Sequence, residues 1–260
     1  MREFFLKIIN NDNFPNLEIT LFSGWHFMYI ILIVGLPILF SFLFRKKSEE
    51  FKQKFLSVLA ISLISVYILD IFCMPLSEGR IDIDKLPFHI CTIMGIFVPF
   101  AQFNKKFEKI KPTIVCLTLV ASLMYVTYPG SALGDISAFA YKVVQTFVYH
   151  GLMFAWGLMS MTLGDVKLDI KKIWKEAVAI VLIIIWAEFG NIVYSSDTKK
   201  YDWFFVTGRT FGIDKYVMPF VVLASVFGMC AIIYGIYYLV VYLLNKKDNG
   251  KSKEISEKSE

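Results

Sequence analysis

The chain has 260 residues, of which 57% are hydrophobic and 19% are charged, and its formal net charge is +5. Soluble domains usually contain about 45–50% apolar and about 25% charged residues. The composition therefore excludes a disordered chain, a disulfide scaffold and a soluble nucleic-acid-binding protein, and it predicts a membrane protein that crosses the bilayer several times.

Seven apolar runs follow one another along the chain. They cover residues 19–44, 55–77, 86–104, 112–134, 143–164, 177–196 and 216–245. Each run is long enough to cross about 30 Å of hydrocarbon, because a helix needs about 20 residues for that distance. The fold class expected is therefore all-α, a polytopic bundle of seven transmembrane helices. A single domain, residues 1–245, is followed by a predicted disordered tail, residues 246–260.

Basic residues alternate between the loops of this predicted bundle. The loops 45–54, 105–111 and 167–175 and the tail from residue 246 hold 18 of the 27 Lys and Arg residues. Because Lys and Arg stay on the cytoplasmic side, this bias predicts the N-terminus outside, the C-terminus inside, and a location in the cell (plasma) membrane. The positive charge thus indicates topology, and no nucleic-acid partner is expected.

Polar residues gather near the predicted outer ends of the helices. His26, His89 and His150 lie at the starts of the first, third and fifth runs. Asp70 and Glu188 lie towards the ends of the second and sixth runs, which cross in the opposite direction. Polar groups in a bilayer are costly and usually face the bundle interior, so the pattern predicts one polar pocket on the outer side. The alternative is that each side chain lies separately among lipid headgroups.

The thiol of Cys91 is the candidate nucleophile in this pocket. Pro87 suits the first turn of a helix, which would place Cys91 near the positive end of the helix dipole, where a thiolate is favoured. The thiol needs a base, and His150 or His26 from another helix is geometrically easier than His89. Residues i and i+2 of a helix point to different faces. The predicted chemistry is attack by the thiolate on a lipid ester.

Other polar side chains would complete the site. The carboxylate of Glu188 or Asp70 would orient the imidazole of the base. The expected binding residues are His26, Gln145, Asn191, Tyr128 and Arg209. This chemistry requires no cofactor and no metal, and its partners would be membrane lipids, with a phospholipid or lysophospholipid as substrate.

Several alternatives stay open at this point. A disulfide between Cys73 and Cys91 on the outer side would silence the nucleophile. Three histidines and a carboxylate could hold Zn²⁺ for hydrolysis, although their spacing matches no zinc motif. A transporter or receptor would use the same pocket without covalent chemistry. The loop 199–209 mixes aromatic and basic residues and is either a lid at the headgroups or an ordinary interfacial loop.

The segment Leu86-Pro87-Phe88-His89-Ile90-Cys91 resembles the YwaF-like family of bacterial multi-pass membrane proteins. The likeness extends through residues 128–130 and 145–151. The eukaryotic relatives of that family include a transmembrane acyltransferase that moves acyl chains onto lysophospholipids through a cysteine nucleophile. The resemblance implies that Cys91 is this nucleophile, with His89 beside it in the motif and His150 as a second family histidine. The region after residue 196, which contains Arg209, is less similar.

Overall fold

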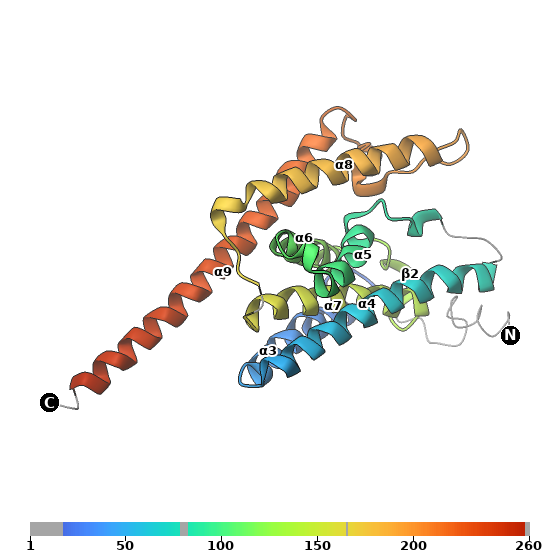
Figure 1. The fold of residues 1–260 in the computed structure, drawn as a ribbon. Helices are drawn as coiled ribbons and strands as arrows, with labels where there is room; N and C mark the ends of the chain where they lie inside the picture. Colours follow the sequence, from blue (N-terminus) through green and yellow to red (C-terminus); the bar gives the residue numbers. More distant parts are fainter. Residues whose placement is uncertain (1–17, 79–82, 165, 258–260) are drawn as a thin grey trace.

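The computed structural model describes residues 18–78, 83–164 and 166–257, with their side chains except at 73–78, 134–136 and 244–257. This part of the chain is mostly helical (Figure 1). The helices are α2 (Gly24–Ile30), α3 (Leu36–Phe44), α4 (Glu49–Glu78), α5 (Ile90–Phe103), α6 (Lys111–Thr127), α7 (Tyr141–Thr162), α8 (Trp174–Tyr194) and α9 (Met218–Glu257). A π-helix, Ile31–Gly35, joins α2 to α3, and two short strands, β1 (Glu18–Ile19) and β2 (Gly134–Ser137), pair antiparallel.

The predicted apolar runs and the observed helices coincide. Because α2, the π-helix and α3 are continuous, the described residues form seven long helical segments, which confirms the all-α class. Four of the described segments are long and apolar enough to cross a membrane: Gly24–Phe44, Glu49–Phe72, Ile170–Tyr194 and Met218–Leu243. The apolar helices α5 and α6 are shorter, with 14 and 17 residues. The chain is therefore a membrane protein, and the number of seven spans stays a prediction.

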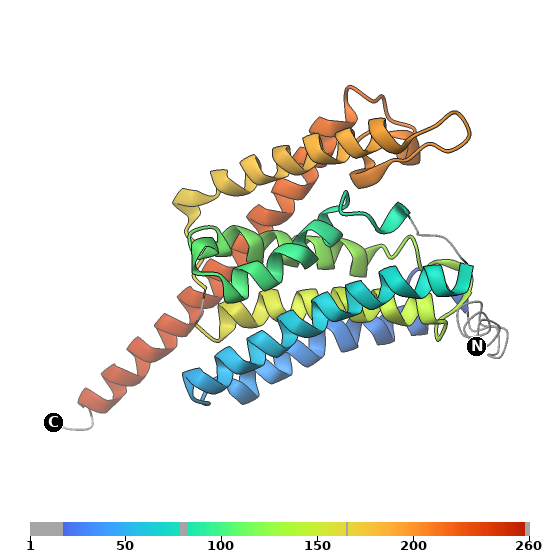
Figure 2. The same cartoon turned by 45° about the vertical axis from the view of Figure 1, so that its right-hand side comes forward.

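Helix α6 lies at the centre of the bundle (Figure 2). It contacts α5, α7, α8 and α9, and most of its residues are buried. Gly157 of α7 allows a close approach, because a Cβ there would lie 2.9 Å from Cγ of Leu119 on α6. Small residues serve this purpose at helix contacts in membranes. Helices α8 and α9 instead expose many aliphatic side chains outward, as expected of helices that face lipid.

The connections divide into two groups at opposite ends of the bundle. One group, here called the β end, contains β1, β2 and the loops 83–89, 128–140 and 195–217. The other, here called the basic end, contains the loops 45–48, 104–110 and 163–173. At the β end Lys199 Nζ lies 3.5 Å from Asp84 Oδ2, and at the basic end Lys175 Nζ lies 3.3 Å from the Lys109 carbonyl oxygen. The alternation of basic loops thus follows the two ends, and which end faces outside stays a prediction.

The last helix differs from its predicted extent. Composition predicts a disordered tail from residue 246, whereas α9 continues to Glu257 (Figure 1). Lys and Glu are good helix formers, so a helix that leaves the bundle can continue through this segment.

Candidate functional site

Cys91 lies at the second position of α5, closer to the helix end than expected. His89 is the N-cap, with extended backbone angles (φ −91°, ψ 147°), and α5 begins at Ile90. Pro87 lies in the turn before the helix instead of in its first turn. The His89 side chain makes no capping hydrogen bond. The first-turn N–H groups of α5 have no partner within the helix.

The Cys91 side chain is a free thiol packed against α6. Its Sγ lies 3.8 Å from the Ala121 carbonyl oxygen, to which it donates a weak hydrogen bond. The Tyr149 hydroxyl of α7 donates to the Cys91 carbonyl oxygen at 3.1 Å, so α7 fixes the backbone at this position. Cys73, the alternative disulfide partner, has a side chain outside the described part of the structure.

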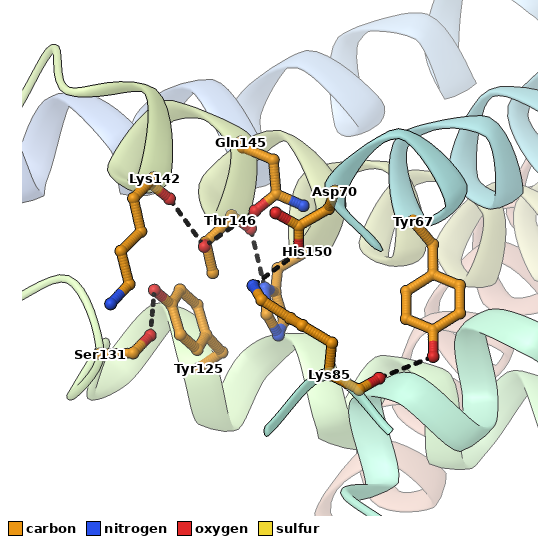
Figure 3. Close-up of polar contacts among 9 residues, drawn as sticks. All are labelled: Tyr67, Asp70, Lys85, Tyr125, Ser131, Lys142, Gln145, Thr146 and His150. Atoms are coloured by element: carbon orange, nitrogen blue, oxygen red, sulfur yellow. Dashed lines mark hydrogen bonds and ion pairs between the residues drawn. The ribbon is translucent and has the colours of Figure 1, made fainter. Parts of the chain in front are cut away.

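His150 on α7 has its ring fixed in one orientation (Figure 3). Its Nδ1 lies 2.8 Å from the Thr146 carbonyl oxygen, and the Tyr125 ring stacks on it with centroids 3.8 Å apart and planes 10° apart. Because a carbonyl only accepts, Nδ1 carries the hydrogen, and Nε2 of the neutral ring carries the lone pair. Nε2 is buried and has no hydrogen-bond partner among the described residues. The arrangement leaves one basic nitrogen free in the bundle interior.

One stretch of α6 contacts both Cys91 and His150. Ala121 contacts the thiol and Tyr125 stacks on the imidazole. Residues four apart in a helix lie one above the other on the same face. Tyr149 also connects them, since its hydroxyl donates to the Cys91 carbonyl oxygen and it directly precedes His150 in α7. We call Cys91, Tyr125, Tyr149 and His150 the Cys–His site. In the described structure the Cys91 thiol is hydrogen-bonded to the Ala121 carbonyl oxygen and not to the His150 ring.

The other two histidines have structural contacts. His26 uses both ring nitrogens, since Nε2 lies 2.8 Å from the Val126 carbonyl oxygen and Nδ1 accepts from the Phe22 N–H at 3.0 Å. His89 Nδ1 accepts from the Phe204 N–H at 3.2 Å. Within the described ranges no three His, Cys, Asp or Glu side chains are grouped as metal ligands. The zinc alternative therefore has no support in the geometry.

Asp70 forms an ion pair instead of orienting an imidazole (Figure 3). Its Oδ2 lies 2.5 Å from Lys85 Nζ, and only 8% of its side chain is exposed. The Tyr67 hydroxyl donates to the Lys85 carbonyl oxygen at 2.7 Å. The Thr146 carbonyl takes the orienting role that was expected of a carboxylate. Lys85 was missed by the sequence reasoning, and its position directly before an apolar run was the signal.

The predicted residues of α8 are not brought to the Cys–His site. Glu188 is exposed on the outer face of α8, and Asn191 is buried. Asn191 holds the backbone of Trp203, with Oδ1 accepting from its N–H at 2.8 Å and Nδ2 donating to its carbonyl at 3.3 Å. The helices packed against α8 decide which of its faces is buried, and the sequence of α8 alone did not reveal that.

The remaining predicted binding residues lie at the β end. Gln145 accepts from the Thr146 hydroxyl at 3.1 Å, beside the Cys–His site. Tyr128 is exposed, and Arg209 is exposed with Nη1 3.5 Å from the Tyr201 carbonyl oxygen. Only Gln145 is therefore close to His150.

The loop 195–217 folds back over the start of α5. Tyr201 and Trp203 stack with ring centroids 4.4 Å apart, and Trp203 and Phe204 are almost fully buried. Phe204 has φ of 55°, an uncommon left-handed conformation for a bulky residue. The hydrogen bond from the Phe204 N–H to His89 Nδ1 connects the loop to the N-cap residue of α5, the helix that contains Cys91. The sequence left open whether this loop is a lid at the headgroups or an ordinary interfacial loop, and part of it packs over the start of α5.

The carboxylate of Asp202 accepts hydrogen bonds from other residues of the loop 195–217. Partial burial raises the pKa of Asp202, but hydrogen bonds from Thr207 and Thr210 outweigh it and hold the pKa below its usual value of 3.8. The N–H groups of Thr207 and Thr210 lie 2.9 and 3.0 Å from the two carboxylate oxygens. Because the pKa of Asp202 is lower in the folded loop than in the unfolded chain, the ionised carboxylate stabilises the loop at pH values above the unfolded pKa. This stabilisation is lost as the pH falls through the folded pKa.

We therefore expect Trp203 fluorescence to change only below about pH 4, which is near the ordinary Asp value. In Asp202→Asn this acid transition should vanish, and the loop should be less stable at neutral pH by about 1–2 kcal/mol. Comparison with Trp203→Phe isolates the signal of this one tryptophan. An unchanged acid transition in Asp202→Asn would contradict the role of the carboxylate.

Comparison of the sequence with known proteins identifies the family to which the chain belongs. No curated protein and no solved structure matches the chain. The TMEM164 family, a family of multi-pass membrane proteins, matches residues 21–237, which include every residue of the Cys–His site. Because this match covers far more than half of the sequence, the chain belongs to the TMEM164 family.

Proposed function

We propose that this membrane protein transfers acyl chains between phospholipids through a thioester on Cys91, with His150 as the base. The observation that carries the proposal is the unpartnered Nε2 of His150, which adjoins the same stretch of α6 as the free thiol. A buried nitrogen with an unused lone pair costs free energy, so its retention is explained by a proton that it must accept. Cysteine nucleophiles activated by a histidine are common in acyl transfer.

The reaction proceeds in two halves. The thiol turns from the Ala121 carbonyl, Nε2 of His150 takes its proton, and the sulfur attacks the ester carbonyl carbon of a phospholipid. The C–O bond then breaks, the leaving oxygen takes the proton from His150, and a lysophospholipid departs. In the second half a lysophospholipid hydroxyl loses its proton to His150 and attacks the thioester, which releases the thiol. With water as the acceptor, the same steps give ester hydrolysis.

The start of α5 supplies the electrostatic part of the mechanism. The N–H groups of the first turn have no helical partner and no side-chain cap. Such groups can hold the oxyanion of a tetrahedral intermediate, and their dipole favours the negative charge.

Variants at Cys91 test the proposal. Purified protein in liposomes should transfer a labelled acyl chain to lysophospholipid, and Cys91→Ala should lower the rate at least 10²-fold, since it removes the nucleophile. An acyl adduct should form on the protein, release with hydroxylamine as a thioester does, and map to Cys91.

Cys116→Ala is the matched control, because Cys116 is also a free cysteine but is buried on α6 and is not among the residues described in contact with His150. It should keep both adduct and transfer. Full activity in Cys91→Ala would exclude this mechanism. Specific lipid binding without any adduct would favour a transporter or receptor.

The finer topology belongs to the same proposal. We infer seven spans, with the β end outside and the basic end at the cytoplasmic surface of the plasma membrane. The excess of Lys and Arg in the loops of the basic end supports this orientation. The resemblance to YwaF-like proteins supports the cysteine mechanism.

A further inference from the structure

A second site lies at the basic end, far along the bundle from the Cys–His site. There α6, α8 and α9 enclose a cleft of about 160 Å³. Residues from all three helices and from the loops 104–110 and 163–173 line it. The cleft contains none of the residues of the proposed acyl-transfer reaction, so the inference below does not depend on that reaction.

Most of the lysines that line the cleft form no ion pair with a carboxylate in the described structure. Lys172 lies 3.2 Å from Asp169, and this pair is neutral as a whole. Lys109, Lys167 and Lys175 also line the cleft, and in the described part of the chain they form no ion pair with a carboxylate. The exposed carboxylate of Glu108 lies at the rim. Four lysines against three carboxylates give the lining a net charge of +1, which favours an anionic ligand.

Two helix starts converge on the same cleft. Thr113 lies in the first turn of α6 and Glu176 in the first turn of α8, and both line the cavity. Neither helix has a side-chain capping bond at its N-terminus. The N–H groups of Lys111 and Glu176 donate to backbone carbonyls and Pro112 has no N–H, so the remaining first-turn groups, such as the Thr113 N–H, are the ones that could bind a ligand. First-turn N–H groups and the positive end of the helix dipole bind phosphate in many proteins. The lysines and both helix starts therefore favour the same kind of ligand.

Glu176 points to a hydrogen-bond donor on that ligand. The residue is only 1% exposed, and its Oε1 accepts from the Tyr234 hydroxyl at 2.9 Å. Its Oε2 has no hydrogen-bond partner among the described residues, although Thr113 interacts with the carboxylate. A buried carboxylate oxygen without a donor is costly. A hydroxyl or ammonium group of a ligand in the cleft would satisfy it.

We propose that the cleft binds a phosphate ester that also carries a hydroxyl or ammonium group. The phosphoryl group lies among Lys109, Lys167, Lys175 and the starts of α6 and α8. The hydroxyl or ammonium group donates a hydrogen bond to Glu176 Oε2. The cavity is smaller than the roughly 300 Å³ of typical small-molecule sites, so it holds a headgroup-sized fragment. This fragment belongs either to a phospholipid or to a soluble phosphate ester.

Native mass spectrometry of the full chain in phosphatidylcholine nanodiscs tests the site. Equal amounts of phosphatidylglycerol and phosphatidylmethanol with the same acyl chains are added; both are anionic, but only phosphatidylglycerol carries hydroxyl donors. The protein should retain phosphatidylglycerol in preference. Lys167→Gln with Lys175→Gln should lower its retention about tenfold, and Glu176→Gln should abolish the preference between the two lipids.

Lys171→Gln is the matched control, because Lys171 lies in the same segment but does not line the cleft. It should retain phosphatidylglycerol as the unchanged protein does. Displacement by glycerol 3-phosphate supports a soluble ester, and retention despite it supports the lipid. Equal retention of the two lipids together with no binding of glycerol 3-phosphate would overturn the proposal even if Glu176→Gln failed to fold. Unchanged retention of phosphatidylglycerol in the double lysine variant would overturn it as well.

Discussion

Replacing His150 with Phe should lower acyl transfer by about 10²–10⁴-fold, the usual contribution of a general base. A phenyl ring can still stack on Tyr125, so the packing between α6 and α7 is preserved in outline. What is lost is Nε2, the nitrogen whose lone pair no described residue occupies. The measurement is the initial rate of labelled acyl transfer to lysophospholipid, normalised to folded protein.

His26→Gln is the control for this prediction. His26 Nε2 joins α2 to the Val126 carbonyl near the end of α6, and its Nδ1 accepts from the Phe22 N–H in the turn before α2. Its replacement should lower the free energy of unfolding by about 1–3 kcal/mol and leave the rate per folded molecule within about threefold. If His150→Phe kept more than a tenth of the rate, or if His26→Gln lost as much, His150 would not be the base.

Replacing Gly95 with Ala should disrupt the Cys–His site through sterics alone. A Cβ at Gly95 would lie 1.8 Å from the Tyr149 hydroxyl oxygen and 2.8 Å from its Cζ. Tyr149 is only 5% exposed, so the ring cannot move freely and its hydrogen bond to Cys91 must break. Such overpacking usually costs about 1–3 kcal/mol. We expect a lower melting temperature and a loss of transfer activity together.

A double variant separates the steric cause from a general effect of alanine. Gly95→Ala with Tyr149→Leu should be less destabilised than the sum of the single changes, because the shorter side chain vacates the space. Gly228→Ala is the matched control on α9, since nothing lies within 4 Å of its new Cβ. That change should be neutral or stabilising by up to about 1 kcal/mol. Additive effects at Gly95 and Tyr149 would contradict the contact.

Sequence patterns predicted the helices well because each lies in one long apolar run. They also predicted that His26, His89 and His150 gather near one end of the bundle. His26 and His150 do contact neighbouring residues of α6, Val126 and Tyr125, whereas His89 contacts Phe204. The roles of the three histidines were not predictable. The carbonyl that orients His150 belongs to Thr146, four residues earlier in the same helix. Every residue in a helix has a carbonyl at that position, so the sequence carries no signal that distinguishes His150.

The failures concern which face of a helix is buried and which segments lie side by side. Asp70 and Glu188 were equivalent as carboxylates in apolar runs, yet one is paired with Lys85 and the other is exposed. The difference depends on neighbours distant in sequence. The same reason hid the contact between Phe204 and His89, which are 115 positions apart.

The short length of α5 has a consequence for where a lipid would react. Its 14 residues extend about 21 Å, which is about 9 Å less than the hydrocarbon layer. If α5 is one of the seven proposed spans, the bilayer thins around the protein or one end of α5 lies below the interface. In the second case Cys91 approaches the level at which acyl chains begin. A phospholipid could then diffuse sideways to the thiol and exchange its chain while both products stay in one leaflet.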